Sequence, residues 1–234
     1  MKSYPGQKHY LVAVDCIIFG FDGEHLKLLL IKRAFEPKKD EWSLMGGFVQ
    51  PSESLDEAAK RILHQLTGLS DVYLEQLQTL GDPDRDPIER TFSVAYFALI
   101  DIDKYEKQIS SDYHASWVSF NKSPDLIFDH TYMVAMARKS LRYKASLHPI
   151  LFELLPEKFT MRQLQNLYED VYDTSFDKRN FSRKVLSTGL LIKQREKDKT
   201  NSKRGAFYYR LNKKKYATNF HAFIKLIPNL DDRV

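Results

Sequence analysis

The sequence predicts an α+β protein of two domains, an α/β/α sandwich followed by a smaller domain of three helices and a β-hairpin. Three observations lead to this prediction. Strand-like and helix-like segments are mixed through residues 10–143, whereas residues 150–189 hold three short amphipathic segments that precede two strand-like ones. The net charge changes sign between these two parts, and a length of 234 residues suits two domains.

The first part begins with a predicted β-hairpin. Residues 10–19 are apolar with few breaks, Asp22 and Gly23 supply a turn, and residues 26–31 are apolar again. Further strands and one amphipathic helix complete the sandwich, at residues 72–80, 91–102, 115–118 and 129–143. We therefore predict an N-terminal domain of residues 1–146 and a C-terminal domain of residues 147–234.

A loop and a helix in the N-terminal domain carry its most specific pattern. Gly46 and Gly47 allow a sharp turn or a close approach of the backbone. Ser54, at a predicted N-cap, forms a capping box with Glu57 three residues later. Apolar residues then recur at helical spacing, which predicts one buried face: Ala58, Ala59, Ile62, Leu63 and Leu66.

Four residues of the same segment have a fixed spacing, namely Gly47, Glu53, Arg61 and Gly68. This spacing resembles the Nudix box, the loop–helix–loop of enzymes that hydrolyse nucleoside diphosphates linked to other groups. The resemblance implies that glutamates directly after the arginine and near the end of the helix bind magnesium and activate water.

The positions of those glutamates hold other residues here: Ile62, Gln65 and Leu66. Apolar side chains cannot bind a hard cation that takes oxygen ligands, and Gln65 offers only a neutral oxygen. Glu53 and Arg61 alone make at most a salt bridge. We therefore expect a catalytically inactive Nudix domain with no catalytic residue, no metal and no cofactor. An active hydrolase with a relocated metal site is the alternative.

The composition is that of an intracellular globular protein. The chain is 43% hydrophobic and 29% charged, which is ordinary for such proteins. Its single cysteine, Cys16, excludes an intrachain disulfide framework and fits a reducing compartment. No apolar run approaches the roughly 20 residues that a membrane span needs. We expect a cytoplasmic protein without a membrane partner.

The charge is unevenly distributed along the chain. Residues 148–234 contain 18 Lys and Arg against 10 Asp and Glu, whereas the preceding residues contain 18 against 21. The C-terminal part is therefore basic and the N-terminal part slightly acidic. This asymmetry indicates a polyanionic partner for the C-terminal domain.

The C-terminal domain has the element order of a winged helix-turn-helix. Residues 150–155 form a short amphipathic helix, Thr160 caps a second helix, and a third helix ends at Gly189. Residues 190–192 and 206–210 are strand-like, and the charged residues 193–205 join them. In this fold the third helix enters the major groove of DNA.

The third helix carries Phe181, Val185 and Leu186, and it is expected to turn Phe181 and Val185 inward. The polar residues around them then face outward, where they can contact DNA: Lys178, Arg179, Asn180, Ser182, Arg183 and Lys184. The hairpin offers cations for phosphate or minor-groove contact: Lys197, Lys199, Lys203 and Arg204. The alternative is a solvated helix face and a charged loop with no nucleic-acid partner.

The two domains together resemble the Nudix-related transcriptional regulators. Residues 152–160 and 177–181 match the second domain of that family, and the loop residues 81–87 match the first. The resemblance implies a homodimer that binds an inverted-repeat operator in double-stranded DNA and responds to a small effector held by the Nudix domain. One branch of the family senses ADP-ribose, and another, in Bacteroidetes-like bacteria, senses L-arabinose.

We expect the effector to be a free sugar such as L-arabinose, with ADP-ribose as the alternative. A diphosphate ligand normally requires a metal or a dense cationic clamp, and the metal carboxylates are missing. A sugar requires carboxylates, amides and an aromatic face, which gives these candidates: Asp15, Glu41, Trp42, Asp82, Asp84 and Arg85. Alternatively, Trp42 is a core residue and the acidic loop residues are merely solvated.

Three classes of function therefore compete. The first is a DNA-binding repressor with a sensor domain, which we favour. The second is a Nudix hydrolase with a nucleic-acid-binding module, which Ile62 and Leu66 disfavour. The third is an RNA-binding or scaffold protein, which lacks the clustered exposed aromatic residues expected for base stacking.

Overall fold

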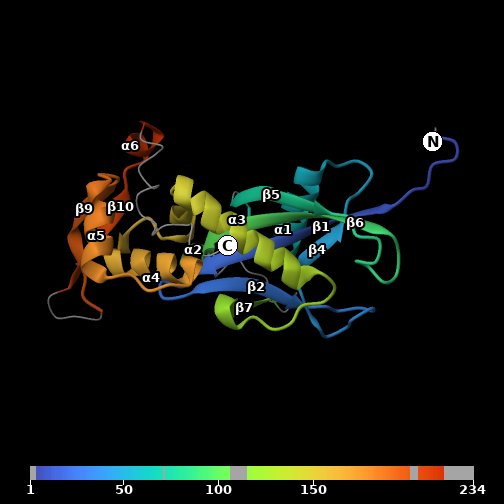
Figure 1. Ribbon diagram of the computed structural model, residues 1–234, viewed down its shortest axis with the longest axis horizontal. Coiled ribbons are helices and arrows are strands. Elements are labelled where there is room, and N and C mark those ends of the chain that lie inside the picture. Colours follow the sequence, from blue (N-terminus) through green and yellow to red (C-terminus); the bar gives the residue numbers. More distant parts are fainter. Residues whose placement is uncertain (1–3, 71, 106–114, 201–204, 219–234) are drawn as a thin grey trace.

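The computed structural model describes residues 4–70, 72–105, 115–200 and 205–218 of the chain. The first part of the chain contains β1 (Leu11–Phe21), β2 (Leu26–Lys32), β3 (Trp42–Ser43), β4 (Met45–Phe48), α1 (Leu55–Thr67), β5 (Tyr73–Leu80), β6 (Thr91–Asp101), α2 (Ile102–Tyr105), β7 (Ser116–Ser119), η3 (Phe120–Lys122) and α3 (His130–Leu147) (Figure 1). The second part contains η4 (Ile150–Leu154), β8 (Phe159–Thr160), α4 (Met161–Tyr172), α5 (Lys178–Ser187), β9 (Leu191–Asp198), β10 (Ala206–Leu211) and α6 (Lys213–Thr218).

A mixed sheet forms the centre of the first part. Its strand order is β3-β2-β1-β6-β5, with β4 paired to β1 and β7 paired to β2. The long strands β1 and β6 are parallel, in register from Leu11 opposite Thr91 to Phe21 opposite Asp101. Both strands are almost continuously apolar because helices cover both faces of the sheet. Ile17 packs on the face covered by α3, and Ile18 on the face covered by α1. The predicted α/β/α sandwich is confirmed.

Local sequence signals set the ends of α1. The N–H of Glu57 donates to Ser54 Oγ at 3.3 Å, and the N–H of Ser54 donates to Glu57 Oε2 at 2.8 Å. These two bonds form the predicted capping box. Gly68 ends the helix with φ of 76°, a left-handed conformation that favours glycine.

The second part is a winged helix fold, also as predicted. Thr160 caps α4 through a second capping box, Asp177 caps α5, and the small sheet has the order β8-β10-β9. Phe181 and Val185 of α5 are buried, with 4% and 1% of their surface exposed.

Leu186 of the same helix is exposed, because one residue advances a helix by about 100° and only the face with Phe181 and Val185 meets α4. Two details of the second part differ from the prediction. Residues 150–154 form a 3₁₀-helix, since the flanking Pro149 and Pro156 leave room for little more than one turn. β9 continues to Asp198, because its exposed charged side chains do not prevent pairing with β10.

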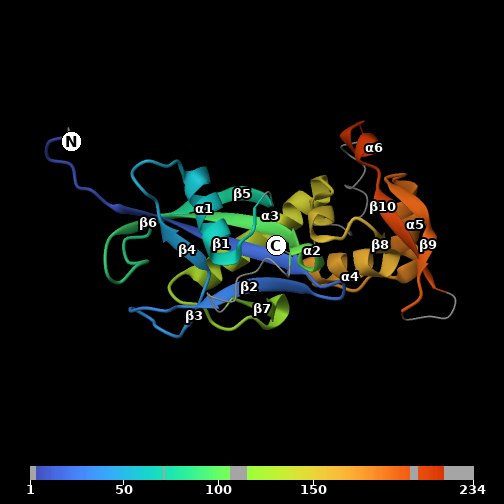
Figure 2. The same ribbon diagram turned by 180° about the vertical axis from the view of Figure 1, so that it is seen from behind.

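The two parts share one hydrophobic core. Leu151 and Leu154 of η4 are fully buried and belong to the same cluster as Leu99 of β6 and Leu164 of α4. The winged helix therefore packs directly on the sheet, and α5 with its hairpin lies at one end of an elongated molecule (Figures 1 and 2). No helix in the described ranges is long and apolar enough to cross a membrane.

Candidate functional site

A buried polar cluster lies beside the central strands of the first part. We call it the Asp15 cluster; its members are Asp15, Arg85, Asp129 and His130. Asp15 is only 7% exposed, on β1 opposite Gly46 of β4. A Cβ atom on Gly46 would overlap Asp15 Oδ1, so glycine is required there. Ser93 of β6 donates its hydroxyl to Asp15 Oδ2 at 2.5 Å, which fixes the carboxylate.

Arg85 is the cation of this cluster. Its side chain is 5% exposed and donates two hydrogen bonds to Asp129, Nε to Oδ2 at 2.9 Å and Nη2 to Oδ1 at 2.8 Å. Arg85 Nη2 also lies 3.8 Å from Asp15 Oδ2. The guanidinium is thus held between two carboxylates. Its paired N–H donors, which bind the two oxygens of Asp129, are also suited to two oxygens of a phosphate group.

His130 is the fourth member of the Asp15 cluster, and it is almost fully buried. Its Nδ1 accepts from the N–H of Leu44 at 3.2 Å, so the ring proton is on Nε2, which faces Asp15 Oδ1 at 3.6 Å. Burial lowers the pKa of His130 below its ordinary value, and this effect outweighs the opposing attraction of Asp15. The cluster therefore contains two acids and one permanent cation.

The structure brings together two of the six residues predicted to bind the effector. Asp15 and Arg85 meet, as described above. The other four lie apart from that contact, and they are Asp82, Asp84, Glu41 and Trp42. Asp82 and Asp84 are exposed in the loop that carries Arg85, where Asp82 Oδ1 accepts from the N–H of Asp84 at 3.0 Å.

Glu41 and Trp42 have different local partners. Glu41 is exposed and pairs with Lys38 at 3.2 Å. Trp42 is half-buried on β3, with the ammonium of Lys32 5.4 Å from its ring centre. Sequence analysis missed Asp129 and His130, which appeared there only as the start of a helix. The sequence signal that could have identified them is an aspartate followed by a histidine at the N-terminus of a predicted helix.

The Nudix-box residues of α1 are arranged for structure and not for metal binding. Glu53 and Arg61 form the expected salt bridge, with bonds of 2.6 and 2.8 Å, and this hydrogen bonding lowers the pKa of Glu53 to about 2. Ile62 is buried against Gly47, and Gln65 accepts from Arg61 at 3.2 Å. Within the described part of the chain, no three His, Cys, Asp or Glu side chains gather as metal ligands. These residues do not fit magnesium.

A basic surface covers the outer face of α5. Every residue predicted there to contact DNA is exposed except Ser182, which is partly buried: Lys178, Arg179, Asn180, Arg183 and Lys184. Arg183 Nη2 donates to Asn180 Oδ1 at 2.7 Å, so these two side chains lie side by side. The helix thus presents both arginine and asparagine, the residue types that read guanine and adenine.

The hairpin adds further cations to this basic surface. Lys199 is exposed just beyond β9, whereas Lys203 and Arg204 lie outside the described residues. Lys193 and Lys197 pack over the ring of Phe207, with their ammonium groups 3.6 and 4.4 Å from its centre. Sequence analysis missed Lys193 because it treated this segment as a loop.

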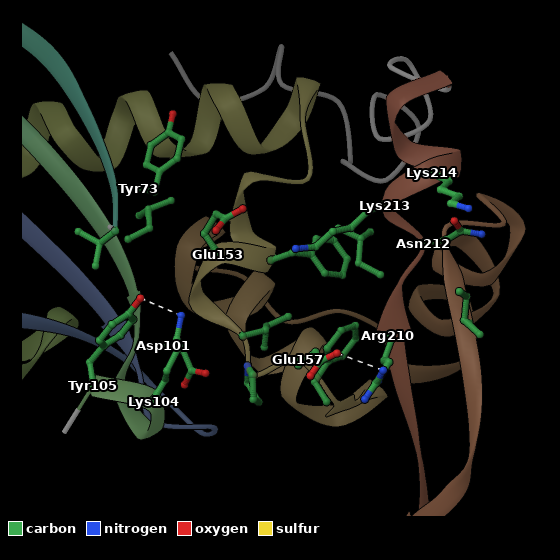
Figure 3. Close-up of a pocket in the computed structure, with 18 residues that line it drawn as sticks. Tyr73, Asp101, Lys104, Tyr105, Glu153, Glu157, Arg210, Asn212, Lys213 and Lys214 are labelled. Carbon is green, nitrogen blue, oxygen red and sulfur yellow. Dashed lines mark hydrogen bonds and ion pairs between the residues drawn. The ribbon is translucent and has the colours of Figure 1, made fainter. Parts of the chain in front are cut away.

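A cavity of about 890 Å³ lies where the two parts meet, near β5, η4 and β10. Figure 3 shows Asp101 and Lys104 on one side of it and Arg210 and Lys213 on the other. Lys104 donates to the hydroxyl of Tyr105 at 2.8 Å. None of the six predicted effector residues lines this cavity, so it is separate from the Asp15 cluster.

Both parts of the chain match known families. The NUDIX domain family matches residues 9–136, and the NrtR DNA-binding winged helix domain family matches residues 151–211. The chain is also 35% identical to the ADPR responsive transcriptional repressor NtrR of Acinetobacter baylyi, over 99% of this chain and 92% of that protein. The chain belongs to the Nudix-related transcriptional regulators.

Solved structures of this family resemble the chain as well. Shewanella oneidensis NrtR, crystallised with a 27mer DNA, is 30% identical with a TM-score of 0.75, over 88% of this chain and 95% of that one. The NUDIX domain of the same protein, crystallised with ADP ribose, is 32% identical with a TM-score of 0.50, over 59% of this chain and 94% of that one. The family assignment therefore holds across both domains.

Proposed function

We propose that this regulator is a repressor that binds duplex DNA through the basic surface of α5 and the hairpin. Residues 147–234 are the proposed DNA-binding domain and residues 1–146 the proposed sensor domain. The observation that carries the proposal is the exposed row of arginine, asparagine and lysine on α5, joined to a Nudix helix without metal carboxylates. Such a molecule has the means to bind DNA and lacks the means to hydrolyse a diphosphate with magnesium.

We propose ADP-ribose as the effector, in place of the L-arabinose that the sequence favoured. The relatives support this choice, since one is named for its response to ADPR and another was crystallised with ADP ribose. Neither of these two relatives is named for arabinose. Arg85 is the proposed phosphate ligand, because its guanidinium already binds a carboxylate with both donors.

We propose a homodimer on an inverted-repeat operator. A two-fold dimer presents two copies of α5 to half-sites about one helical turn apart. The proposed base contacts come from Arg179, Asn180 and Arg183, and the proposed phosphate contacts from Lys184 and Lys199.

The test begins with a duplex selected by the protein from a random-sequence library. Gel shifts then compare that duplex with its single strands, and calorimetry compares ADP-ribose with L-arabinose. We expect preference for the duplex, a heat of binding with ADP-ribose and none with L-arabinose. A parallel assay with magnesium measures ADP-ribose hydrolysis, and steady turnover would contradict the non-enzymatic sensor. Heat with L-arabinose alone would restore the sugar hypothesis.

A further inference from the structure

Helix α3 links the Asp15 cluster to the winged helix. Asp129 directly precedes α3, and Arg85 binds both of its carboxylate oxygens, so the side chain makes no cap to the helix amides. Arg142 lies on this helix, about 20 Å from Asp129 at 1.5 Å per residue. One helix therefore begins in the candidate effector site and passes the end of α4 (Figure 1).

Near its far end, α3 is bound to the C-terminal end of α4 by two reciprocal hydrogen bonds of Arg142, next to a longer bond from Arg138 Nη2 to the carbonyl of Asp170 at 3.4 Å. Arg142 Nε donates to the carbonyl of Val171 at 2.6 Å, and the hydroxyl of Tyr172 donates to the carbonyl of Arg142 at 2.9 Å. We call this pair of bonds the α3–α4 contact. Each helix supplies one donor and one acceptor, so α3 cannot move away from α4 at this point unless both hydrogen bonds break.

The same end of α4 is also fixed to the sheet. The N–H of Leu26, the first residue of β2, donates to Asp170 Oδ2 at 2.6 Å. Asp170 therefore holds α4 to the strands, while the α3–α4 contact holds it to α3. If α3 moved relative to the sheet, it would pull on α4 while Asp170 held α4 to β2. Tyr168 of α4 packs on Phe181 of α5, ring centres 5.6 Å apart, so α5 would follow α4.

We infer that Arg142 and Tyr172 are positioning residues that transmit occupancy of the Asp15 cluster to the DNA-binding helix. This inference rests on the proposed function, and in particular on a phosphate-bearing effector at Arg85. A phosphate competes with Asp129 for the guanidinium, because both bind the same fork of donors. The released carboxylate can then bind the first amides of α3, which changes the position of that helix.

The experiment compares Arg142→Ala and Tyr172→Phe with the wild-type full chain and with Lys139→Ala, an exposed residue of the same helix. Tyr172→Phe removes one hydroxyl and retains the ring stacked on Tyr168. The selected duplex is titrated with and without saturating ADP-ribose, and calorimetry measures ADP-ribose binding to each protein with and without the duplex.

We expect ADP-ribose to change the duplex Kd of the wild type and of Lys139→Ala by about 5- to 150-fold, and that of the two variants by less than about 2-fold. By linkage, the duplex changes the ADP-ribose affinity by the same factor in each protein. The full response in Tyr172→Phe and in Arg142→Ala would overturn the inference alone. A wild-type protein that gives no heat with ADP-ribose would instead refute the proposed effector.

Discussion

Replacement of Arg85 by alanine is the most informative perturbation of the Asp15 cluster. It leaves two carboxylates without their cation, and their side chains are 9% (Asp15) and 20% (Asp129) exposed. Removing one partner of a buried ion pair costs about 3–5 kcal/mol. Because Asp129 retains some contact with water, we take the lower end of this range. A loss of about 3 kcal/mol corresponds to a fall in Tm of about 6–12 °C for a chain of this size.

Urea denaturation of the wild type, Arg85→Ala, Asp129→Asn and the double variant measures this cost. The double variant removes both charges of the Arg85–Asp129 pair. We therefore expect its loss of unfolding free energy to be smaller than the sum of the losses in the two single variants. The expected interaction energy is about 1–3 kcal/mol. Equal stability of wild type and Arg85→Ala would refute the buried pair, and simple additivity would show that the two residues do not interact.

The other predictions concern the DNA surface, the buried histidine and the glycine beside Asp15. Arg179→Ala and Arg183→Ala should each weaken duplex binding by about 1–3 kcal/mol, because both are proposed to contact bases, as measured by titrations at several salt concentrations. Burial holds the pKa of His130 below its unfolded value of 6.5. The unfolded chain therefore binds more protons, and the free energy of unfolding falls as the pH drops below 6.5. Denaturation of His130→Gln at several pH values should lack this part of the pH dependence. Gly46→Ala should lower the Tm and abolish effector binding in calorimetry, because its methyl group overlaps Asp15.

The fold could be predicted from sequence to a large extent because its signals are local. Hydrophobic period, capping boxes and turn residues give the helices and most strands without knowledge of the tertiary structure. Ser54 and Glu57 lie three residues apart, and so do Thr160 and Gln163, and each pair forms the bonds that its spacing predicts. The extension of β9 to Asp198 was not predicted, because its charged side chains give no hydrophobic alternation. The pairing of this edge strand with β10 depends on backbone hydrogen bonds.

The candidate site could be predicted only in part because it is assembled from distant segments. Asp15, Arg85 and Asp129 come from a strand, a loop and the start of a helix. No periodicity relates residues that far apart, so the sequence supplied the residue types and not the pairing. The preference for a sugar effector rested on the missing metal carboxylates and on the types of six residues, and neither observation identifies a ligand; the relatives named for ADP-ribose favour the alternative.

The affinity of the full chain for its selected duplex, titrated with ADP-ribose without magnesium, decides whether this protein is an ADP-ribose-responsive regulator. We expect ADP-ribose to change the duplex Kd in a saturable manner while the nucleotide remains intact, and L-arabinose to change nothing. A duplex affinity that is independent of ADP-ribose at saturating concentration would contradict this expectation.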